Sequence, residues 1–233
     1  MKKLNTAFLH IATIGNEYNE IANEIVDLIY ESELLENLTK LYILVLGDGK
    51  LNLNVTNNIN IIYYSTDIRL YEYPTLQLIE DYALNNNANI LYLTGIGVTG
   101  RTLDRENKRK YITHFVIKRW KDCIKNLNDN YDCVGVDWSP NPLPHFSGFM
   151  WWATSNYLKT LPKVSELNTE KYPPIVFKDR INGDTISYRH NAEFWVGMKD
   201  PKWKSLHQSM KINKHGRYIW SFHTPEWNEN LYK

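Results

Sequence analysis

The chain has 233 residues, a mass of 27.5 kDa and a net charge of +1, and 43% of its residues are hydrophobic. This length and composition predict a single large domain with a sizeable core. No apolar run reaches the length of about 18 residues that a membrane span needs. The near-neutral charge, without a basic block, argues against nucleic acid as the main partner.

The N-terminal segment begins with basic residues and a short apolar run but lacks an A-x-A cleavage site, so we expect a first strand there, not a signal peptide. Cys123 and Cys133 do not form a C-x-x-C motif. They are expected to be small buried residues in a reducing cytoplasm.

Strands and amphipathic helices are expected to alternate through the first 140 residues. The patterns predict strands over residues 6–15, 40–50, 58–65, 89–97 and 132–138, and helices over residues 17–32, 73–86 and 104–127. The strands are almost continuously apolar, which is typical of a mostly parallel sheet with helices on both faces. Residues 162–185 are predicted to form a loop, and the tail near residues 217–227 a strand-like piece. The expected fold is therefore a single α/β, Rossmann-like domain.

In a sheet of this kind, ligands bind beyond the carboxyl ends of the strands. The candidate site is thus built from the segments "ATIGN", "LGDG", "STD", "LTGIGVTG" and "VDW". The chain has no G-x-G-x-x-G and no G-K-[ST] motif, which disfavours dinucleotide-binding and P-loop enzymes. The segment "HFSGF" is not G-x-S-x-G, and no histidines show H-E-x-x-H spacing, so a serine hydrolase and a zinc motif are also disfavoured.

The segment "PHFSGFMWWATSNY" at residues 144–157 combines small polar residues with aromatic ones. Gly148 would allow close approach of a ligand or of backbone. Trp151 and Trp152 are adjacent, so in a strand their rings would face opposite sides of the sheet. One indole could then fill the core while the other lines a cleft and stacks on a sugar. The alternative is that both indoles belong to the core.

Three segments in order resemble a family of small glycosyltransferases with the GT-A fold, found in bacterial polysaccharide loci and in large DNA viruses. They are "NILYLTGIGV", "YDCVGVDW" and "PHFSGFMWWATSNYLKTLP", followed by "RHNAEFWVG". Family members read "YLHTKGV", then "HFSGNFWWA", then a Glu-x-Trp. The resemblance covers roughly residues 6 to 197, and its most specific element is the "HFSG" segment with the tryptophan pair.

The resemblance implies transfer of a sugar from a nucleotide-diphospho-sugar, foremost a UDP-sugar, to a hydroxyl of a glycan acceptor in the cytoplasm. Residues 1–140 would form the nucleotide-binding half and residues 141–233 the acceptor-side half. The implied donor-binding residues are Thr13, Gly15, Asn16, Asp67, Thr94 and Gly95, and the implied sugar- and acceptor-binding residues are Asp137, His145, Ser147, Gly148, Trp151 and Trp152. Glu193 would be the general base of an inverting reaction.

The chain departs from the family pattern at three places. Thr94-Gly95-Ile96 stands where the family has His-Thr-Lys, and Phe149-Met150 stands where it has Asn-Phe. No Asp-x-Asp follows the fourth strand, so dependence on Mn²⁺ or Mg²⁺ stays open. The charge of a leaving diphosphate would be met by Arg101, Arg189 or His190, or by a metal held through fewer ligands.

Two rival functions remain. The first is a nucleotide- or sugar-binding protein of a glycosylation assembly that has lost turnover. The second is an α/β domain that acts only through protein contacts. The second rival predicts no pocket at the strand ends and two wholly buried tryptophans.

Overall fold

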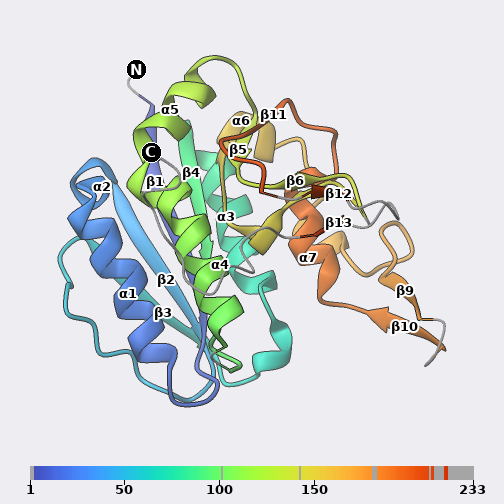
Figure 1. Ribbon diagram of the computed structural model, residues 1–233, viewed down its shortest axis with the longest axis horizontal. Coiled ribbons are helices and arrows are strands. Elements are labelled where there is room, and N and C mark those ends of the chain that lie inside the picture. The colour runs from blue at the N-terminus through green and yellow to red at the C-terminus, as the bar shows by residue number, and fades with distance from the viewer. Residues whose placement is uncertain are drawn as a thin grey trace.

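The computed structural model describes residues 3–100, 102–141, 143–179, 183–209, 211–212 and 218–219. Its centre is a seven-stranded sheet with the strand order β11-β5-β8-β4-β1-β2-β3 (Figure 1). The strands are β1 (Leu4–Ala12), β2 (Lys40–Leu46), β3 (Ile59–Ser65), β4 (Ala88–Thr94), β5 (Cys133–Gly135), β8 (Trp151–Thr154) and β11 (Trp203–Ser205). The first five match the strands expected from the sequence.

The sheet is mostly parallel. Strand β1 runs parallel to β2 and β4, β2 parallel to β3, and β5 parallel to β11. Strand β8 alone among these seven is antiparallel to its neighbours β4 and β5, and its register sets Trp151 opposite Tyr92 and Trp152 opposite Leu91. The predicted α/β class is confirmed.

Helices cover both faces of the sheet (Figure 1). One face packs against α1 (Tyr18–Glu31), α2 (Leu34–Asn37), α4 (Leu103–Thr113), the π-helical turn His114–Lys118 and α5 (Trp120–Asn128). The other face packs against α3 (Tyr73–Asn85), α6 (Ser155–Leu158), α7 (His190–Phe194) and the short 3-10 helices η4 (Val164–Glu166) and η5 (Trp195–Gly197). Alternate residues of β1 pack into the cores on the two faces of the sheet, with Leu9 in the first core and Phe8 in the second.

The helix expected over residues 104–127 is interrupted. A π-helical turn separates α4 from α5, and five consecutive or near-consecutive apolar residues around it are buried: Tyr111, Ile112, Phe115, Val116 and Ile117. A π turn releases a carbonyl group from the regular helical pattern. The carbonyl of Val116 accepts a hydrogen bond of 2.8 Å from the indole Nε1 of Trp152.

Short elements complete the fold. They are the hairpins β6 (Trp138–Ser139) with β7 (His145–Phe146), β9 (Ile175–Asp179) with β10 (Gly183–Ser187), and β12 (Lys211–Ile212) with β13 (Tyr218–Ile219), and the 3-10 helices η1 (Ile68–Leu70) and η3 (Ser147–Phe149). The expectation that residues 162–185 form a loop is wrong in part, because η4 and β9 fall within that range. Most of the tail segment 217–227 lies outside the described residues.

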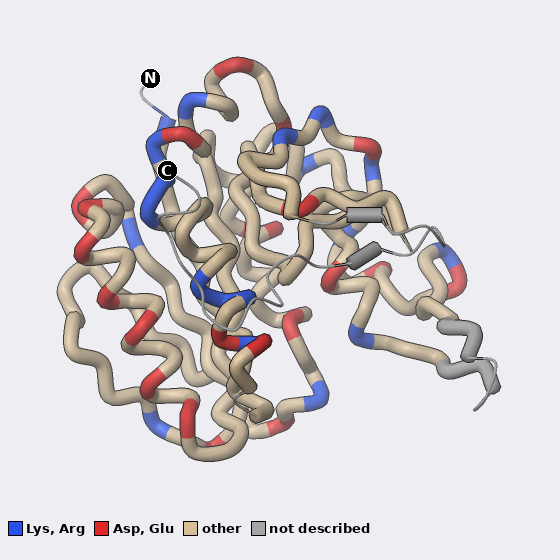
Figure 2. The backbone as a smooth tube through the Cα atoms, in the orientation of Figure 1, with Lys and Arg blue, Asp and Glu red and all other residues tan. Residues whose placement is uncertain are grey.

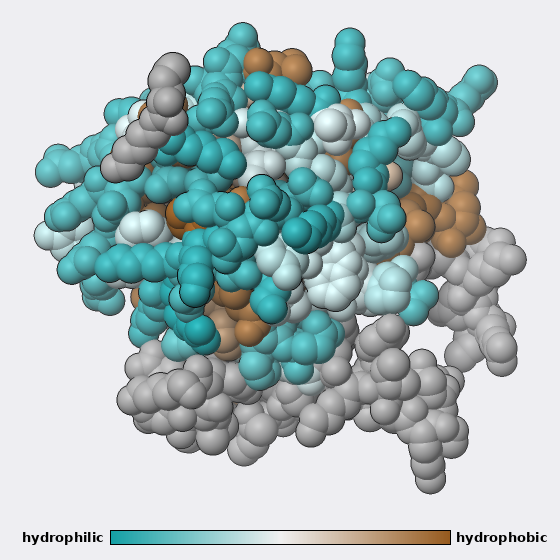
Figure 3. Space-filling model, turned by 90° about the horizontal axis from the view of Figure 1, so that it is seen from above, coloured by the Kyte–Doolittle hydropathy of each residue, from teal (hydrophilic) through white to brown (hydrophobic). Residues whose placement is uncertain are grey.

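Charged residues of both signs are interspersed along the chain (Figure 2). On the face seen in Figure 3, hydrophilic residues predominate and hydrophobic ones form small separate patches. Cys123 and Cys133 are buried and free, as expected from their spacing. Within the part of the chain that the structure describes, no helix is both long enough and apolar enough to cross a membrane.

Candidate functional site

A cleft of about 370 Å³ opens at the carboxyl ends of β1 and β4, where the topology of the sheet predicted a ligand site. Its floor comes from β1 and from the turn after β4, and these are joined by a hydrogen bond of 3.0 Å from the Gly95 amide to the His10 carbonyl. Its walls come from the segment around η1, from the start of α4, from η3 and from Arg189. The second rival's prediction of no pocket at the strand ends is therefore wrong.

The turn after β4 is fixed from behind by a buried arginine. Arg109 of α4 is fully buried and pairs with Glu24 of α1 through two hydrogen bonds of 3.1 and 2.6 Å. Its Nη1 also donates to the carbonyl of Ile96 at 2.7 Å. Because a two-point contact with a carboxylate fixes the plane of the guanidinium group, Arg109 holds this edge of the cleft in one position.

Positive charge dominates the lining. Arg69, Arg105, Lys108 and Arg189 border the cleft, and Glu72 is the single acidic residue among the described lining residues. Arg105 is held by hydrogen bonds from Nη1 to Thr99 Oγ1 at 3.1 Å and to the Gly100 carbonyl at 2.8 Å. Burial lowers the pKa of Lys108, and Glu193 and Asp137 oppose this shift. Such a lining favours an anionic ligand.

Arg189 joins two buried carboxylates at one end of the cleft. Its Nη2 lies 3.1 Å from Glu72 Oε1, and its Nε lies 3.0 Å from Glu193 Oε1. His190 Nε2 lies 3.5 Å from the other oxygen of Glu193. Burial raises the pKa of Glu193 to about 7, with Arg189 opposing and Glu72 adding to the rise. Glu193 therefore changes its charge near neutral pH.

Two further polar atoms are buried in this part of the molecule. Glu72 Oε2 and the hydroxyl of Tyr92 have no hydrogen-bond partner among the described residues. His10 lies on the cleft floor, where its Nδ1 contacts Thr75 Oγ1 at 2.9 Å and burial lowers its pKa. Orphaned polar atoms beside a cleft are typical of a site that is completed by water or ligand.

The expected donor-binding residues divide into two groups. Thr94 and Gly95 line the cleft. Thr13 does not, because its Oγ1 donates to the Leu46 carbonyl and accepts from the Gly49 amide, which ties the end of β1 to the loop after β2. Gly15 and Asn16 are exposed and lie outside the described lining.

Asp67 borders the cleft only indirectly. Its carboxylate caps η1 and pairs with Arg69 at 2.8 and 2.9 Å, and these contacts lower its pKa to about 2. Asp67 thus orients Arg69, which does line the cleft.

The "HFSG" segment lies beside the cleft through its glycine. Gly148 lines the cleft at a φ of +75°, and an added Cβ would overlap Ile112 Cδ1. His145 is buried with its Nδ1 2.7 Å from the Leu143 carbonyl, and burial lowers its pKa. Ser147 is buried, and its Oγ has no described partner. The close approach expected at Gly148 is made by the protein's own α4.

The expectation that one tryptophan faces the cleft is wrong. Trp151 and Trp152 do point to opposite faces of the sheet, as adjacent strand residues must, but they are only 2% and 0% exposed. Trp151 packs on Tyr92 and Trp195 in one core, and Trp152 packs in the other. Both faces of the sheet are covered by helices, so neither side of β8 is open to a ligand.

Asp137 is likewise internal. It is fully buried, and its carboxylate accepts hydrogen bonds from the amide and hydroxyl groups of Ser209. Of the expected cations, Arg189 lines the cleft, His190 contacts Glu193 from outside the described lining, and Arg101 lies outside the described residues.

Sequence reasoning missed Arg69, Arg105, Lys108 and Glu72. Arg105 and Lys108 carried a usable pattern, because they are three positions apart at the start of a helix that follows a strand end. The segment around η1 had no such pattern. Its position depends on the turn between β3 and α3, which only the folded chain defines.

Phe149 occupies the cleft wall in a strained conformation. Its φ is +60°, a region that Asn enters more readily than Phe. Its ring packs on His145 and Phe194 with centroid distances of 5.7 and 6.3 Å. The ring contacts thus offset a strain of about 1–2 kcal/mol.

We expect Phe149→Asn to leave the free energy of unfolding within about 1 kcal/mol of the wild type, since relief of strain offsets the lost ring contacts. Phe149→Val keeps an apolar side chain but is β-branched, and should lose about 2 kcal/mol more. Urea unfolding of both variants measures the order. A valine variant as stable as the asparagine variant would contradict the inference that the backbone at Phe149 is strained.

Among the described residues, no group of three His, Cys, Asp or Glu side chains is close enough together to hold a metal ion. Of the charged residues that border the cleft, four are cationic and one, Glu72, is acidic.

The fold and the cleft define an α/β protein with a cleft bordered by cationic side chains at the carboxyl ends of parallel strands. The chain belongs to the family described as a domain of unknown function, DUF8361, whose model matches residues 8–204. No curated protein matches the chain.

Two solved structures resemble the chain remotely. One is 4-diphosphocytidyl-2C-methyl-D-erythritol synthase from Anaerococcus prevotii DSM 20548, with 11% identity, a TM-score of 0.48 and 99% of each chain covered. The other is Rv0371c from Mycobacterium tuberculosis H37Rv, in complex with manganese, with 7% identity, a TM-score of 0.42 and 88% of each chain covered. At these values neither likeness carries an argument about function.

Proposed function

We propose that the protein is an inverting glycosyltransferase that moves a sugar from a nucleotide-diphospho-sugar, foremost a UDP-sugar, to a hydroxyl of a glycan acceptor. The observation that carries this proposal is the cleft bordered by four cationic side chains. One of them, Arg189, lies 3.0 Å from the carboxylate of Glu193, a residue outside the described lining. The cleft supports a diphosphate ligand, and the carboxylate supports removal of a proton.

In the proposed reaction, the acceptor oxygen attacks the anomeric carbon while the bond between that carbon and the diphosphate oxygen breaks. The electron pair of the broken bond stays on the diphosphate, where Arg105 and Lys108 would stabilise the developing charge. The acceptor proton passes to Glu193. With the base and the leaving group on opposite faces of the sugar ring, the configuration inverts.

Binding of UDP tests the cationic cleft. Arg105→Gln and Lys108→Gln should each raise the Kd for UDP about tenfold, because each removes one charged hydrogen-bond donor worth about 1.5 kcal/mol. Lys110→Gln is the matched control, since Lys110 is on the same helix, pairs with Glu106 and lies outside the described lining. Isothermal titration calorimetry gives the three values.

Release of nucleotide from a panel of donor sugars tests transfer itself. Absence of UDP binding, or equal weakening by Lys110→Gln, would contradict the assignment of this cleft as the donor site.

A second candidate is a binding protein of a glycosylation assembly without turnover. It is favoured by the engagement of both Glu193 oxygens, one with Arg189 and one with His190. This candidate predicts that UDP binds, that no donor of the panel releases nucleotide, and that Glu193→Gln leaves UDP binding unchanged.

A further inference from the structure

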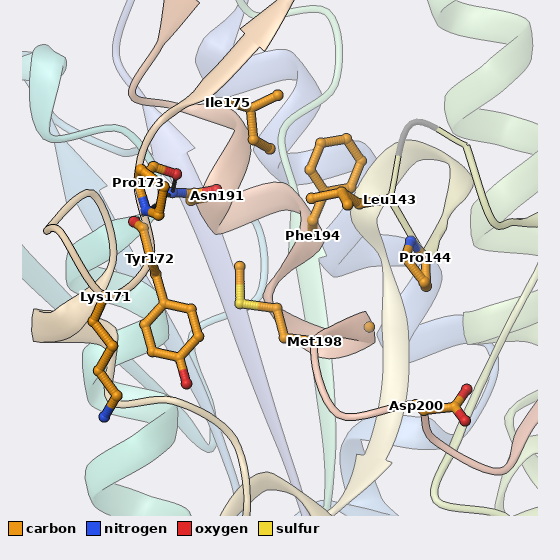
Figure 4. Close-up of a pocket in the computed structure, with 11 residues that line it drawn as sticks. Leu143, Pro144, Lys171, Tyr172, Pro173, Ile175, Asn191, Phe194, Met198 and Asp200 are labelled. Atoms are coloured by element: carbon orange, nitrogen blue, oxygen red, sulfur yellow. Dashed lines mark hydrogen bonds between the residues drawn. The ribbon is translucent and has the colours of Figure 1, made fainter.

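A second cavity of about 610 Å³ lies on the other side of α7 from the cleft. Arg189, which precedes α7, contacts Glu193 of the helix, whereas Asn191 and Phe194 are three positions apart on α7 and line the second cavity. Figure 4 shows Tyr172 and Lys171 on one side of Met198, and Leu143 and Pro144 on the other. The volume is in the range of small-molecule sites.

The walls of this cavity are mainly apolar. Leu143, Pro144, Tyr172, Ile175, Phe194 and Met198 supply most of them. The buried amide of Asn191 is engaged, because its Nδ2 donates to the carbonyls of Tyr172 and Pro173 and to Asn168 Oδ1. Lys171 at the rim pairs with Glu166 at 3.0 Å. A ligand here would be recognised by apolar contact more than by charge.

The cavity and the cleft are separated by a layer of three rings. Phe149 lines the cleft, Phe194 lines the cavity, and His145 packs against both, with centroid distances of 5.7 and 4.8 Å. Because these rings are in contact, the two sites are neighbours. One molecule that passes over the ring layer could place a polar part at the cleft and an apolar part in the cavity.

We propose that the second cavity binds the apolar aglycone of the acceptor, so that the acceptor is a sugar carrying an alkyl or aryl group, and not a free polar glycan. This inference rests on the proposed transfer reaction, because only that reaction makes the ligand an acceptor. Binding of an apolar ligand in the cavity can be tested separately. The aglycone gains affinity by burying apolar surface against the aromatic and aliphatic walls, at about 25 cal/mol for each Å².

The test uses the neutral fluorescent probe N-phenyl-1-naphthylamine. Ile175→Asp and Met198→Asp place a charge in the cavity and should each raise the Kd of the probe at least tenfold. Val176→Asp is the matched control, because Val176 is next to Ile175 in β9 but is 48% exposed and outside the described lining. The Kd of the probe for this variant should stay within twofold of the wild-type value. Octyl glucoside below its micellar concentration should displace the probe, and glucose should not.

Circular dichroism and UDP calorimetry on the same variants separate the two proposals. UDP binding should change less than twofold, since none of these residues borders the cleft. Equal probe binding in all variants, or no displacement by octyl glucoside, would overturn the aglycone site. Normal probe behaviour without any UDP binding would instead overturn the proposed transfer reaction and leave an apolar ligand site.

Discussion

Replacing Glu193 with glutamine should lower the rate of sugar transfer at least a hundredfold and leave the Kd for UDP within twofold. A general base contributes about 10²–10⁴ to a rate, and glutamine has nearly the same shape but cannot take up the proton. Nucleotide release under single-turnover conditions measures the rate. Glu80→Gln is a control at another partly buried carboxylate, one that accepts a hydrogen bond from the Val164 amide and lies outside the described cleft lining.

The pH dependence of the transfer rate identifies the residue that accepts the proton. With a pKa of about 7, Glu193 is protonated below neutral pH, so the rate should rise with pH and level off above about 7. Arg189 opposes the rise in this pKa, so Arg189→Gln should move the rise in rate to higher pH. A pH profile that is unchanged by Arg189→Gln, or activity retained by Glu193→Gln, would assign the proton to another residue.

The same pKa affects stability with a definite sign. Because the folded-state pKa of Glu193 lies above its ordinary value of 4.5, the folded chain loses stability as the pH rises from that value through about 7. The loss is about 3 kcal/mol by the conversion of pKa into free energy. Burial lowers the pKa values of His10 and His145, which act in the opposite direction in both proteins. The loss should therefore appear in urea unfolding as a change, between pH 5 and pH 8, in the difference between the wild type and Glu193→Gln.

Replacing Gly197 with alanine should lower the free energy of unfolding by about 3 kcal/mol, the upper part of the range for overpacking. An added Cβ would overlap the carbonyl oxygen of Pro144, a backbone atom that cannot rotate away. Relief requires η5 to move away from the segment that precedes β7. Thermal and urea unfolding measure the loss.

Gly15→Ala is the comparison for Gly197→Ala. Gly15 has a φ of +68°, but its nearest neighbour to an added Cβ is the Val98 carbonyl at 3.4 Å, an ordinary contact. It should therefore lose only about 1 kcal/mol, the cost of left-handed backbone. A loss at Gly15 as large as that at Gly197 would show that backbone conformation, and not overlap with Pro144, decides the effect.

The alternating strands and helices of the N-terminal part could be predicted from the sequence, because each of these elements has a local sequence pattern. Strands β1 to β4 are continuous apolar runs, and Pro74 marks the start of α3, so each element carries its own evidence. The insertion of β8 between β4 and β5 was not readable. It depends on pairing between residues 90 and 153, which neither propensity nor periodicity records.

The position of the site was predictable and much of its chemistry was not. Parallel strands fix where a cleft opens, so Thr94 and Gly95 were expected there. The prediction that one tryptophan faces the cleft failed, because a short aromatic strand has the same sequence pattern whether its side chains line a cleft or fill two cores. Arg69 and Glu72 reach the cleft from a turn after the third strand, and that turn has no pattern of its own.

The antiparallel strand β8 also determines the order in which the sheet can assemble. Strands β1 to β4 come from the first 94 residues and pair only with one another, apart from the outer edge of β4. That edge is completed by β8, and β5 reaches the rest of the sheet only through β8. Residues 133–135 can therefore join the rest of the sheet only when residues 151–154 lie between them. Both cores are completed by a strand that is synthesised after β5.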